Sequence, residues 1–516
     1  MILLIGSLLP NLSSAASLSF TIPSSPPSNA SATLTQAPVG VSFEFFAYPA
    51  YVTDVASTEQ CLENLKDLTG VWPPIRIGGT THKTFIATDN ERDRATYDPS
   101  STEAVTYTVA DASDAPETLT FGPPLVALAA DYDGNVTLGL NRRLDNISNT
   151  IAAASLAVDK MSNLYAIELG NEPDCQCEDF AFLRTSKAHM RADSFIVYVS
   201  TDPIADGASW TAADDYASQV EWQDEVFGNL SIENIASAGV YFGTSPESIV
   251  GLTAVEGSAN VYVKDYCSHN YPQSASTADL ETLMGHSDIA SEIEPFAAEV
   301  TAAIAKGKEH VFGETNSATG GGGGISPTFG AGLWILDYVM QSLIMGSKIT
   351  DGADASHFIS IKARSETVSQ YCWWGRYDTG SPYFGAYFAT MALANADQIA
   401  PLDSGDTAFA AYAIYKSGSP IRVLLYNSEY YASGTRSTQV FVLSGLPSST
   451  VTAKRLTASS ATSRVDEGQT PTVAGQYFAN GTCVLTGDEI TETTTASSGK
   501  ATFTVSASEA LLIELS

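Results

Sequence analysis

The feature that most constrains the fold of this chain is a regular alternation of short apolar stretches with longer helical stretches, between about residues 40 and 400. Each apolar stretch is bounded by glycine, proline or polar residues, which is typical of the buried strands of a parallel sheet. The predicted strands are Gly40–Phe46, Pro73–Gly79, Pro123–Ala130, Leu164–Leu169, Asn234–Gly243, Val261–Tyr271, His310–Glu314 and Ala355–Ile361. The predicted helices are Thr58–Leu68, Leu144–Met161, Ala278–Lys306, Phe329–Met345 and Tyr383–Ala396.

This alternation of about eight strands with helices predicts the α/β class and a closed parallel (β/α)8 barrel, the TIM barrel. An open, doubly wound parallel sheet is the alternative architecture. It is disfavoured because no G-x-G-x-x-G turn follows the first predicted strand.

From about Leu402 onward the sequence no longer alternates strand-like with helix-like stretches. The segments AFAAYAIY, IRVLLYN, TQVFVLSGL, TVTAKRLTA and EALLIEL are alternating or apolar strands separated by Ser, Gly, Asn and Thr. Such a series predicts an antiparallel β-sandwich. We therefore expect the barrel over residues 41–400, the sandwich over residues 401–516, and a segment over residues 17–40 that can add a strand to the sandwich.

The first 16 residues resemble a secretory signal peptide. Residues Ile2 to Leu9 are an apolar core and Ser14 to Ala16 are small, although the usual basic start is missing. A buried N-terminal strand is the alternative. Acceptor sequences for N-glycosylation fit export and stand at Asn29, Asn135, Asn146, Asn229 and Asn480, with a further one at Asn11. We expect a secreted, extracellular protein.

The large excess of acidic residues limits the kinds of molecule that the chain can bind. The chain has 25 Lys and Arg against 58 Asp and Glu, a formal net charge of −33, with a pI of about 4.3. Nucleic acid is excluded as a partner because phosphate binding needs basic patches. No stretch after the signal reaches the ~20 apolar residues of a membrane span, so we expect no membrane partner. We also expect the protein to be a monomer.

The six cysteines of an exported chain allow up to three disulfides, and the sequence does not fix their pairing. They are Cys61, Cys175, Cys177, Cys267, Cys372 and Cys483. A zinc site at Cys175-X-Cys177 is disfavoured because no second pair has ligand spacing.

Two acids stand just past predicted strand ends, where a (β/α)8 barrel carries its chemistry. Glu172 follows the strand in YAIELGNEPD, and Glu314 ends the strand in HVFGETN. Two carboxylates that converge from separate strands suit glycoside hydrolysis, in which one protonates the leaving oxygen and the other attacks or activates water. With 58 acids in the chain, the strand-end placement carries the argument and the pairing alone does not.

Around these acids the sequence resembles the retaining (β/α)8 glycosidase superfamily. LGNEP is similar to its acid/base segment after the fourth strand, and GET to its nucleophile segment after the seventh. The segments SFEF, RIGGT and HNYP further resemble glycoside hydrolase family 79, the β-glucuronidases and heparanases. The resemblance extends from about Gly40 to Ser516 and implies a barrel followed by a β-sandwich.

The resemblance also implies roles for single residues. Glu172 would be the acid/base and Glu314 the nucleophile. The implied substrate-site residues are Asn171 on the sugar 2-hydroxyl, Glu44 on another sugar hydroxyl, Arg76 and Tyr271 beside the nucleophile, His269, and Thr319 with Gly320 and Gly321 on the uronate carboxylate. Thr319 stands where the family has a tyrosine, so only a shorter hydroxyl is available there.

The sequence therefore predicts a secreted, retaining exo-β-glucuronidase that acts on glucuronide-containing carbohydrate and needs neither metal nor cofactor. The alternatives are an endo-acting, heparanase-like uronidase and a neutral-sugar β-glycosidase on the same barrel. The non-enzyme alternative is a carbohydrate-binding protein on an inactive barrel. Trp373 and Trp374 follow the last predicted strand, where they can form a sugar platform or simply belong to the core.

Overall fold

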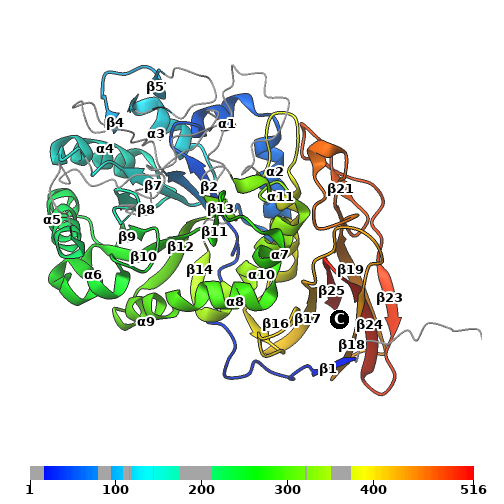
Figure 1. The fold of residues 1–516 in the computed structure, drawn as a ribbon. Coiled ribbons are helices and arrows are strands. Elements are labelled where there is room, and N and C mark those ends of the chain that lie inside the picture. The colour runs from blue at the N-terminus through cyan, green and yellow to red at the C-terminus, as the bar shows by residue number, and fades with distance from the viewer. Residues whose placement is uncertain are drawn as a thin grey trace, which may run out of the picture.

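The computed structural model describes residues 17–79, 94–108, 116, 118–142, 144–174, 211–319, 322–349 and 373–515. Figure 1 shows an α/β barrel (blue to green) beside a β-sandwich (yellow to red). The first strand, β1 (Leu18–Thr21), belongs to the sandwich, where it pairs in parallel with β18 (Thr438–Ser444).

The barrel is a (β/α)8 barrel whose strands are all parallel and follow one another in chain order. Within the described residues, the hydrogen-bonded path runs from β2 at one end to β14 at the other. Because the strands are parallel, their C-terminal ends meet at one face. The strands are β2 (Val41–Glu44), β3 (Ile75–Gly78), β7 (Val136–Leu140), β8 (Leu164–Leu169), β9 (Ala236–Tyr241), β10 (Val263–Asn270), β12 (Glu309–Thr315) and β14 (Ser347–Ile349).

The helices cover the outside of the barrel (Figure 1). Helix α10 is buried along nearly its whole length because it lies between the barrel strands and the sandwich side of the molecule. The helices of the barrel are α1 (Tyr48–Asp54), α2 (Ser57–Thr69), α3 (Pro123–Ala130), α4 (Ile147–Lys160), α5 (Ala212–Leu230), α6 (Ile249–Val255), α7 (Leu280–Met284), α8 (His286–Ile293), α9 (Ala297–Ala305), α10 (Phe329–Met345) and α11 (Ser381–Leu393). Short strands add a sheet of β4 (Arg94–Tyr97), β5 (Val105–Tyr107) and β6 (Thr118–Phe121), and a pair of β11 (Gln273–Ser274) and β13 (Ala318–Thr319).

The third barrel strand is not where the sequence predicted it. The predicted strand Pro123–Ala130 is helix α3, and the third strand is Val136–Leu140. Helix α3 has Pro123 in its first turn, directly after extended Gly122, and consists mainly of Leu and Ala. Proline at the first helical position and a Leu/Ala composition both favour a helix, so an apolar run alone was ambiguous.

The predicted helix Ala278–Lys306 is also not one continuous helix. It is broken into α7, α8 and α9, with the 3-10 turn Glu294–Phe296 between the last two. Gly285 has an extended backbone between α7 and α8, and Pro295 stands in the 3-10 turn. Glycine and proline both interrupt helices, which explains the breaks. The predicted strand Ala355–Ile361 lies outside the described residues, and the described eighth strand is β14.

The sandwich packs a large antiparallel sheet against a smaller one. The large sheet contains β15 (Gln398–Pro401), β16 (Phe409–Lys416), β17 (Ser419–Asn427), β25 (Glu509–Glu514), β19 (Thr450–Thr457), β20 (Thr472–Val473) and β23 (Glu492–Thr495). The smaller sheet contains β1, β18 and β24 (Lys500–Ser506), and β21 (Tyr477–Phe478) pairs with β22 (Leu485–Thr486). Phe441, Leu443 and Val505 of the small sheet share one core with residues of β17 and β25.

A disulfide joins the barrel to the sandwich. Cys61 of α2 is bonded to Cys483, 422 residues away, with 5.4 Å between their Cα atoms. Cys267 is a buried cysteine on β10. The predicted partners Cys175, Cys177 and Cys372 lie outside the described residues, as does the predicted signal peptide.

Within the described part of the chain, none of the helices combines the length and the apolar character that a membrane crossing requires.

Candidate active site

The two predicted catalytic acids meet at the C-terminal face of the barrel. Glu172 lies three residues beyond the end of β8, the fourth barrel strand, and Glu314 lies near the end of β12, the seventh. Both side chains are buried. A carboxylate oxygen of Glu172, one of Glu314 and a ring nitrogen of His269 all lie within 4.8 Å of one another.

Backbone geometry and a side-chain contact with His269 help to hold Glu172. Its φ is 47°, a left-handed value that is strained for any residue except glycine. Its N–H donates to the carbonyl of Val240 at 2.9 Å, and Val240 has a left-handed φ of 56° itself. Its Oε1 lies 2.8 Å from Nδ1 of His269. Burial and the Arg76 cation hold the pKa of His269 well below its usual range, so the ring is neutral.

Two donors hold the carboxylate of Glu314 in place. Nη1 of Arg76 donates to its Oε2 at 2.6 Å, and the hydroxyl of Tyr271 donates to its Oε1 at 2.6 Å. Tyr271 is itself stacked on Phe242, with ring centroids 5.8 Å apart. Both oxygens of Glu314 therefore face defined donors, which suits an ionised nucleophile.

Arg76 lies at the centre of the site and is fully buried. Its Nε donates to both oxygens of Glu168 at 2.9 Å, and its Nη2 donates to Oδ1 of Asn171 at 2.7 Å. Burial opposes the charge of Arg76, but Glu168 and Glu314 outweigh burial and raise its pKa well above the usual value. The guanidinium is therefore a permanent cation that bridges three side chains of the site.

Three glycines border these buried charges, and the Gly78 position must lack a side chain for Arg76 to fit. A Cβ on Gly78 would lie 2.8 Å from Cζ of Arg76. A Cβ on Gly139 would lie 3.6 Å from Oε2 of Glu168, and a Cβ on Gly313 would lie 3.4 Å from Oε1 of the same carboxylate. The barrel interior at this level is thus filled by Arg76 and Glu168 instead of by apolar side chains.

The remaining predicted substrate-site residues are less closely connected to the two acids. Glu44 is buried at the end of β2, and its carboxylate is so near Gly79 that a Cβ there would lie 2.6 Å from it. Thr319 is half-buried on β13, beyond the nucleophile strand. Gly320 and Gly321 lie outside the described residues. Trp373 and Trp374 are buried in the core, where Nε1 of Trp374 donates to Thr58, so they form no sugar platform.

Two functional candidates were missed by sequence reasoning. Glu168 is an acid in the middle of an otherwise apolar strand, and a charge in such a position is a signal that it has a buried partner. Asp174 accepts the backbone N–H groups of Phe242 and Gly243 at 2.8 and 3.0 Å, which fixes the loop that carries Phe242. Burial raises the pKa of Asp174 to about 8.

The site brings together two groups of side chains that could hold a metal ion. Ligand atoms of Glu168, Cys267 and His269, and likewise of Glu172, His269 and Glu314, lie within 4.8 Å of one another. In each group, however, one carboxylate is already bonded to the Arg76 cation, and Glu172 is bonded to His269. Arg76 thus supplies the positive charge that a metal would otherwise bring. The expectation that no metal is needed stays a prediction.

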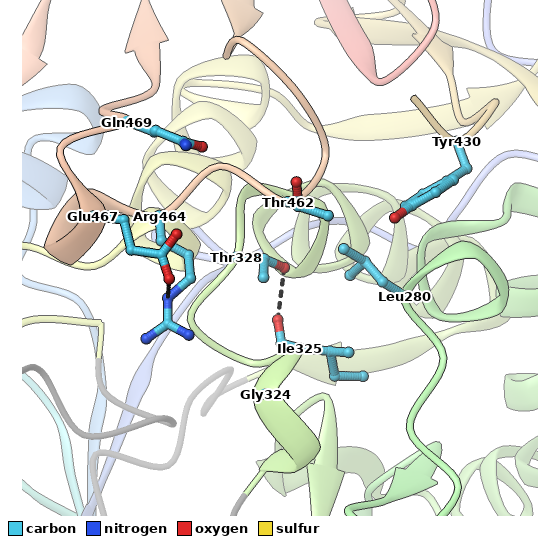
Figure 2. A pocket seen from close by; sticks show the side chains of 9 residues that line it. All are labelled: Leu280, Gly324, Ile325, Thr328, Tyr430, Thr462, Arg464, Glu467 and Gln469. Carbon is cyan, nitrogen blue, oxygen red and sulfur yellow. Dashed lines mark hydrogen bonds and ion pairs between the residues drawn. The ribbon is translucent and has the colours of Figure 1, made fainter. Parts of the chain in front are cut away.

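A separate cleft of about 350 Å³ lies between the barrel and the sandwich (Figure 2). It borders the loop that follows β12, but neither Glu172 nor Glu314 lines it. Its one cation, Arg464, is balanced by Asp466 at 2.6 Å and Glu467 at 3.5 Å. The lining residues are Leu280, Gly324, Ile325, Thr328, Tyr430, Thr462, Arg464, Glu467 and Gln469.

Comparisons with known proteins agree with this architecture. A family model described as the glycosyl hydrolase family 79 C-terminal beta domain matches residues 411–512. A beta-glucuronidase of Neurospora crassa is 25% identical over 512 residues, covering 87% of this chain and 82% of the relative. A beta-glucuronidase of Aspergillus niger is 26% identical over 464 residues, covering 82% of this chain and 77% of the relative.

A solved structure is much more similar. The 4-O-α-L-rhamnosyl-β-D-glucuronidase of Fusarium oxysporum 12S, in complex with Rha-GlcA, is 62% identical, with a TM-score of 0.87. The match covers 96% of this chain and 100% of that chain. Together with the barrel, the sandwich and the two converging acids, this similarity shows that the chain is a glycoside hydrolase and belongs to glycoside hydrolase family 79.

Proposed function

We propose that this protein is a retaining, exo-acting β-glucuronidase with Glu314 as nucleophile and Glu172 as acid/base. The observation that carries the proposal is the distance between the two acids, whose nearer oxygens lie within 4.8 Å. Retaining enzymes hold their carboxyl groups ~5–5.5 Å apart, whereas inverting enzymes need ~6.5–9.5 Å to admit a water. The observed distance supports the retaining arrangement.

The contacts of the two acids support their separate roles. In the first step Glu314 attacks the anomeric carbon while Glu172 gives its proton to the departing oxygen, so an ester to Glu314 forms as the glycosidic bond breaks. In the second step Glu172 takes a proton from water, whose oxygen attacks the anomeric carbon and releases Glu314. Arg76 and Tyr271 keep Glu314 ionised for the attack, and Asn171 is the proposed donor to the sugar 2-hydroxyl.

The proposed substrate is a β-glucuronide, in line with the names of the relatives. Its carboxylate would be bound by Thr319 and the backbone of the glycine loop. The described part of that loop, Gly322 to Gly324, has left-handed φ values of 70°, 53° and 79°. Such a backbone can turn successive N–H groups toward one anion without a charged side chain, which suits an acidic protein.

Comparison of aryl β-glucuronide with aryl β-glucoside tests the substrate class. We expect the glucuronide to be turned over with a kcat/KM at least about 100-fold higher, because a site built to bond a polar group rejects the analogue that lacks it. A preference for the glucoside would contradict the uronate assignment and favour a neutral-sugar β-glycosidase. Turnover of internal linkages in a polysaccharide would favour the endo-acting alternative. Turnover of neither aryl glycoside, nor of the rhamnosylated glucuronide considered below, would favour an inactive barrel.

A second candidate substrate is a β-glucuronide that carries α-L-rhamnose at O4. The observation that favours it is the 62% identity to an enzyme named for that disaccharide unit, against 25% and 26% to the two β-glucuronidases. This candidate predicts faster cleavage of a 4-O-α-L-rhamnosyl β-glucuronide than of the unsubstituted glucuronide of the same aglycone. Equal rates on both substrates would leave the plain β-glucuronidase as the better description.

Secretion stays part of the proposal. The predicted acceptors Asn29, Asn135, Asn146, Asn229 and Asn480 are all exposed, as glycosylation requires. The proposal predicts that the protein appears in the medium of a eukaryotic host and loses apparent mass on deglycosylation. Retention in the cells with no change in mass would contradict it.

A further inference from the structure

We propose that Glu168 is a positioning residue that ties the two catalytic carboxylates together: its buried side chain orients Arg76 on the nucleophile and also faces the His269 ring that holds the acid/base. The inference rests on the proposed function, because it takes Glu314 as nucleophile and Glu172 as acid/base.

On the nucleophile side, Glu168 fixes the plane of the Arg76 guanidinium. Nε of Arg76 donates to both oxygens of Glu168 at 2.9 Å, and its Nη2 lies 2.8 Å from Oε2. Because Glu168 holds the Nε and Nη2 edge of the guanidinium, Nη1 is directed at Oε2 of Glu314, 2.6 Å away. Bidentate pairing sets the orientation of a guanidinium, so Glu168 fixes the direction in which Nη1 of Arg76 points at Glu314.

On the acid/base side, Glu168 shares a small space with Cys267 and His269. The thiol of Cys267 lies 3.9 Å from Oε1 of Glu168. The Cβ position of Gly313 is 2.3 Å from the sulfur, 3.4 Å from Oε1 of Glu168 and 3.7 Å from Nε2 of His269, so these three atoms surround one point. His269 thus presents Nδ1 to Glu172 and Nε2 toward the side where Glu168 lies.

The free-energy cost of burying this carboxylate argues against a role in stability alone. Removing a carboxylate from water is unfavourable, and an apolar replacement of similar volume often stabilises a protein as well or better. Glu168 is nevertheless retained in the barrel interior, where Arg76 bonds both of its oxygens and the thiol of Cys267 lies 3.9 Å from Oε1. A buried acid retained next to the reacting groups points to a task in the reaction.

Glu168 also contributes charge, and its surroundings define the sign of that effect. The titratable or charged groups around it are Arg76 on β3, Asp265, Cys267 and His269 on β10, and Glu314 on β12. Glu172 is bonded to the same His269 ring. Arg76 is the only cation among these groups, and it is shared between Glu168 and Glu314. Removing the charge of Glu168 would leave Arg76 to Glu314 alone and would take a negative charge away from the neighbourhood of Glu172.

The test compares two variants by the pH dependence of kcat/KM on an aryl β-glucuronide. The profile has an acid limb, where Glu314 becomes ionised, and an alkaline limb, where Glu172 loses its proton. Glu168→Gln removes the charge and keeps the length, so both limbs of the profile should move to lower pH by about one unit. Glu168→Asp keeps the charge and shortens the reach, so the limbs should stay in place while kcat falls at least about tenfold. A merely structural Glu168 would change the melting temperature and leave both limbs unmoved.

The matched control is Glu256→Gln. Glu256 is a buried acid bonded to the hydroxyl of Tyr266, outside the barrel mouth. This variant should lower the melting temperature without moving either limb. If Glu168→Gln fails to fold, Glu168→Asp still decides, because an unchanged kcat in that variant would refute the positioning role.

Failure of this inference is distinguishable from failure of the proposed function. If Glu314→Ala retains turnover, the proposed function is wrong, whatever Glu168 does. If Glu314→Ala is inactive but Glu168→Gln leaves both limbs in place, only the role assigned to Glu168 is wrong.

Discussion

At the scale of single residues, the site separates two chemically identical acids by their contacts. Glu314 has a guanidinium and a phenol hydroxyl on its oxygens, whereas Oε1 of Glu172 meets a neutral imidazole. Charged donors favour the ionised form of a carboxylate. This difference in contacts supports the proposed attack by Glu314 and the proposed proton transfer by Glu172, by the same logic that separates the carboxylates of other glycosidases.

The first prediction separates these roles by the leaving group. Glu314→Ala should abolish turnover of every β-glucuronide. Glu172→Ala should reduce kcat/KM by about 10²–10⁴-fold for an alkyl leaving group, which needs protonation, and much less for a nitrophenyl leaving group. Rates measured on a series of leaving groups check this expectation, and equal losses across the series would contradict it. Tyr430→Ala, in the cleft of Figure 2, is a surface control that should leave the rates unchanged.

The second prediction concerns the pH dependence of activity. The reaction needs Glu172 protonated while Glu314 is ionised, and a substrate carboxylate places a further negative charge nearby. We therefore expect kcat/KM to fall on the alkaline side as Glu172 loses its proton, with an optimum at acidic pH. A rate profile that stays flat from weakly acidic to alkaline pH would be incompatible with Glu172 as the acid.

At the scale of elements, the strand-end glycines determine which charges the barrel can contain. Gly78 closes β3 directly against the guanidinium of Arg76, and Gly139 on the neighbouring β7 lies against Glu168. A side chain at Gly78 would displace the guanidinium, whereas a Cβ on Gly139 would touch Glu168 at an ordinary 3.6 Å and would be tight only against Cα of Gly78, at 3.2 Å. The apolar strands thus carry glycine where the interior is occupied by charge instead of hydrocarbon.

The third prediction is that Gly78→Ala damages the site through Arg76. The added methyl would lie 2.8 to 2.9 Å from three atoms of the guanidinium group, which must then move away from Glu314. We expect kcat/KM to fall by about 100-fold and stability by about 1–3 kcal/mol. Gly243→Ala is the control, since its Cβ meets nothing within 4 Å, and it should change neither quantity. Full activity of Gly78→Ala would show that Arg76 does not depend on this space.

Much of this arrangement could be predicted from the sequence, because strand-end acids carry short local motifs. The positions of Glu172, Glu314, Arg76 and Tyr271 relative to one another follow from the order of the strands. Glu168 was missed because its partner lies 92 residues away, and no local pattern pairs the two. The segment Pro123–Ala130 was misassigned because a short apolar run fits a buried strand and a helix equally well until its N-terminal proline is weighed.

At the scale of the whole molecule, a buried ionic cluster connects the barrel to the sandwich. His286 on α8 has Nδ1 2.8 Å from Asp337 on α10 and Nε2 3.0 Å from Asp403 at the start of the sandwich region. The hydroxyl of Tyr412 on β16 donates to Asp337 at 2.5 Å. Burial opposes the charge of His286, but the two aspartates outweigh burial and raise its pKa to about 10. The packing of the two bodies therefore depends on a protonated histidine.

The fourth prediction is a stability profile set by this cluster. A raised histidine pKa contributes stability that is fully present below the unfolded value of about 6.5 and is lost as pH rises through about 10. The pKa of Asp403 is lowered although burial opposes this shift, because His286 bonds the carboxylate; its contribution is present above the unfolded value and is lost as pH falls. Melting temperatures should therefore be highest at weakly acidic pH and decline toward pH 10.

The variant His286→Ala isolates the cluster from other titrating groups. It leaves two buried aspartates without their cation, which should cost about 3–5 kcal/mol at weakly acidic pH. The difference in melting temperature between this variant and the native protein should shrink as pH approaches 10. A constant difference over the whole range would contradict a charged His286.

The central claim, retention through an ester on Glu314, is tested most directly by following the anomers of the released sugar by ¹H NMR. An aryl β-glucuronide should give the β-anomer of glucuronic acid first, and the α-anomer should grow only later by mutarotation, because two displacements restore the configuration. Appearance of the α-anomer as the first product would mean a single displacement by water and would contradict the account.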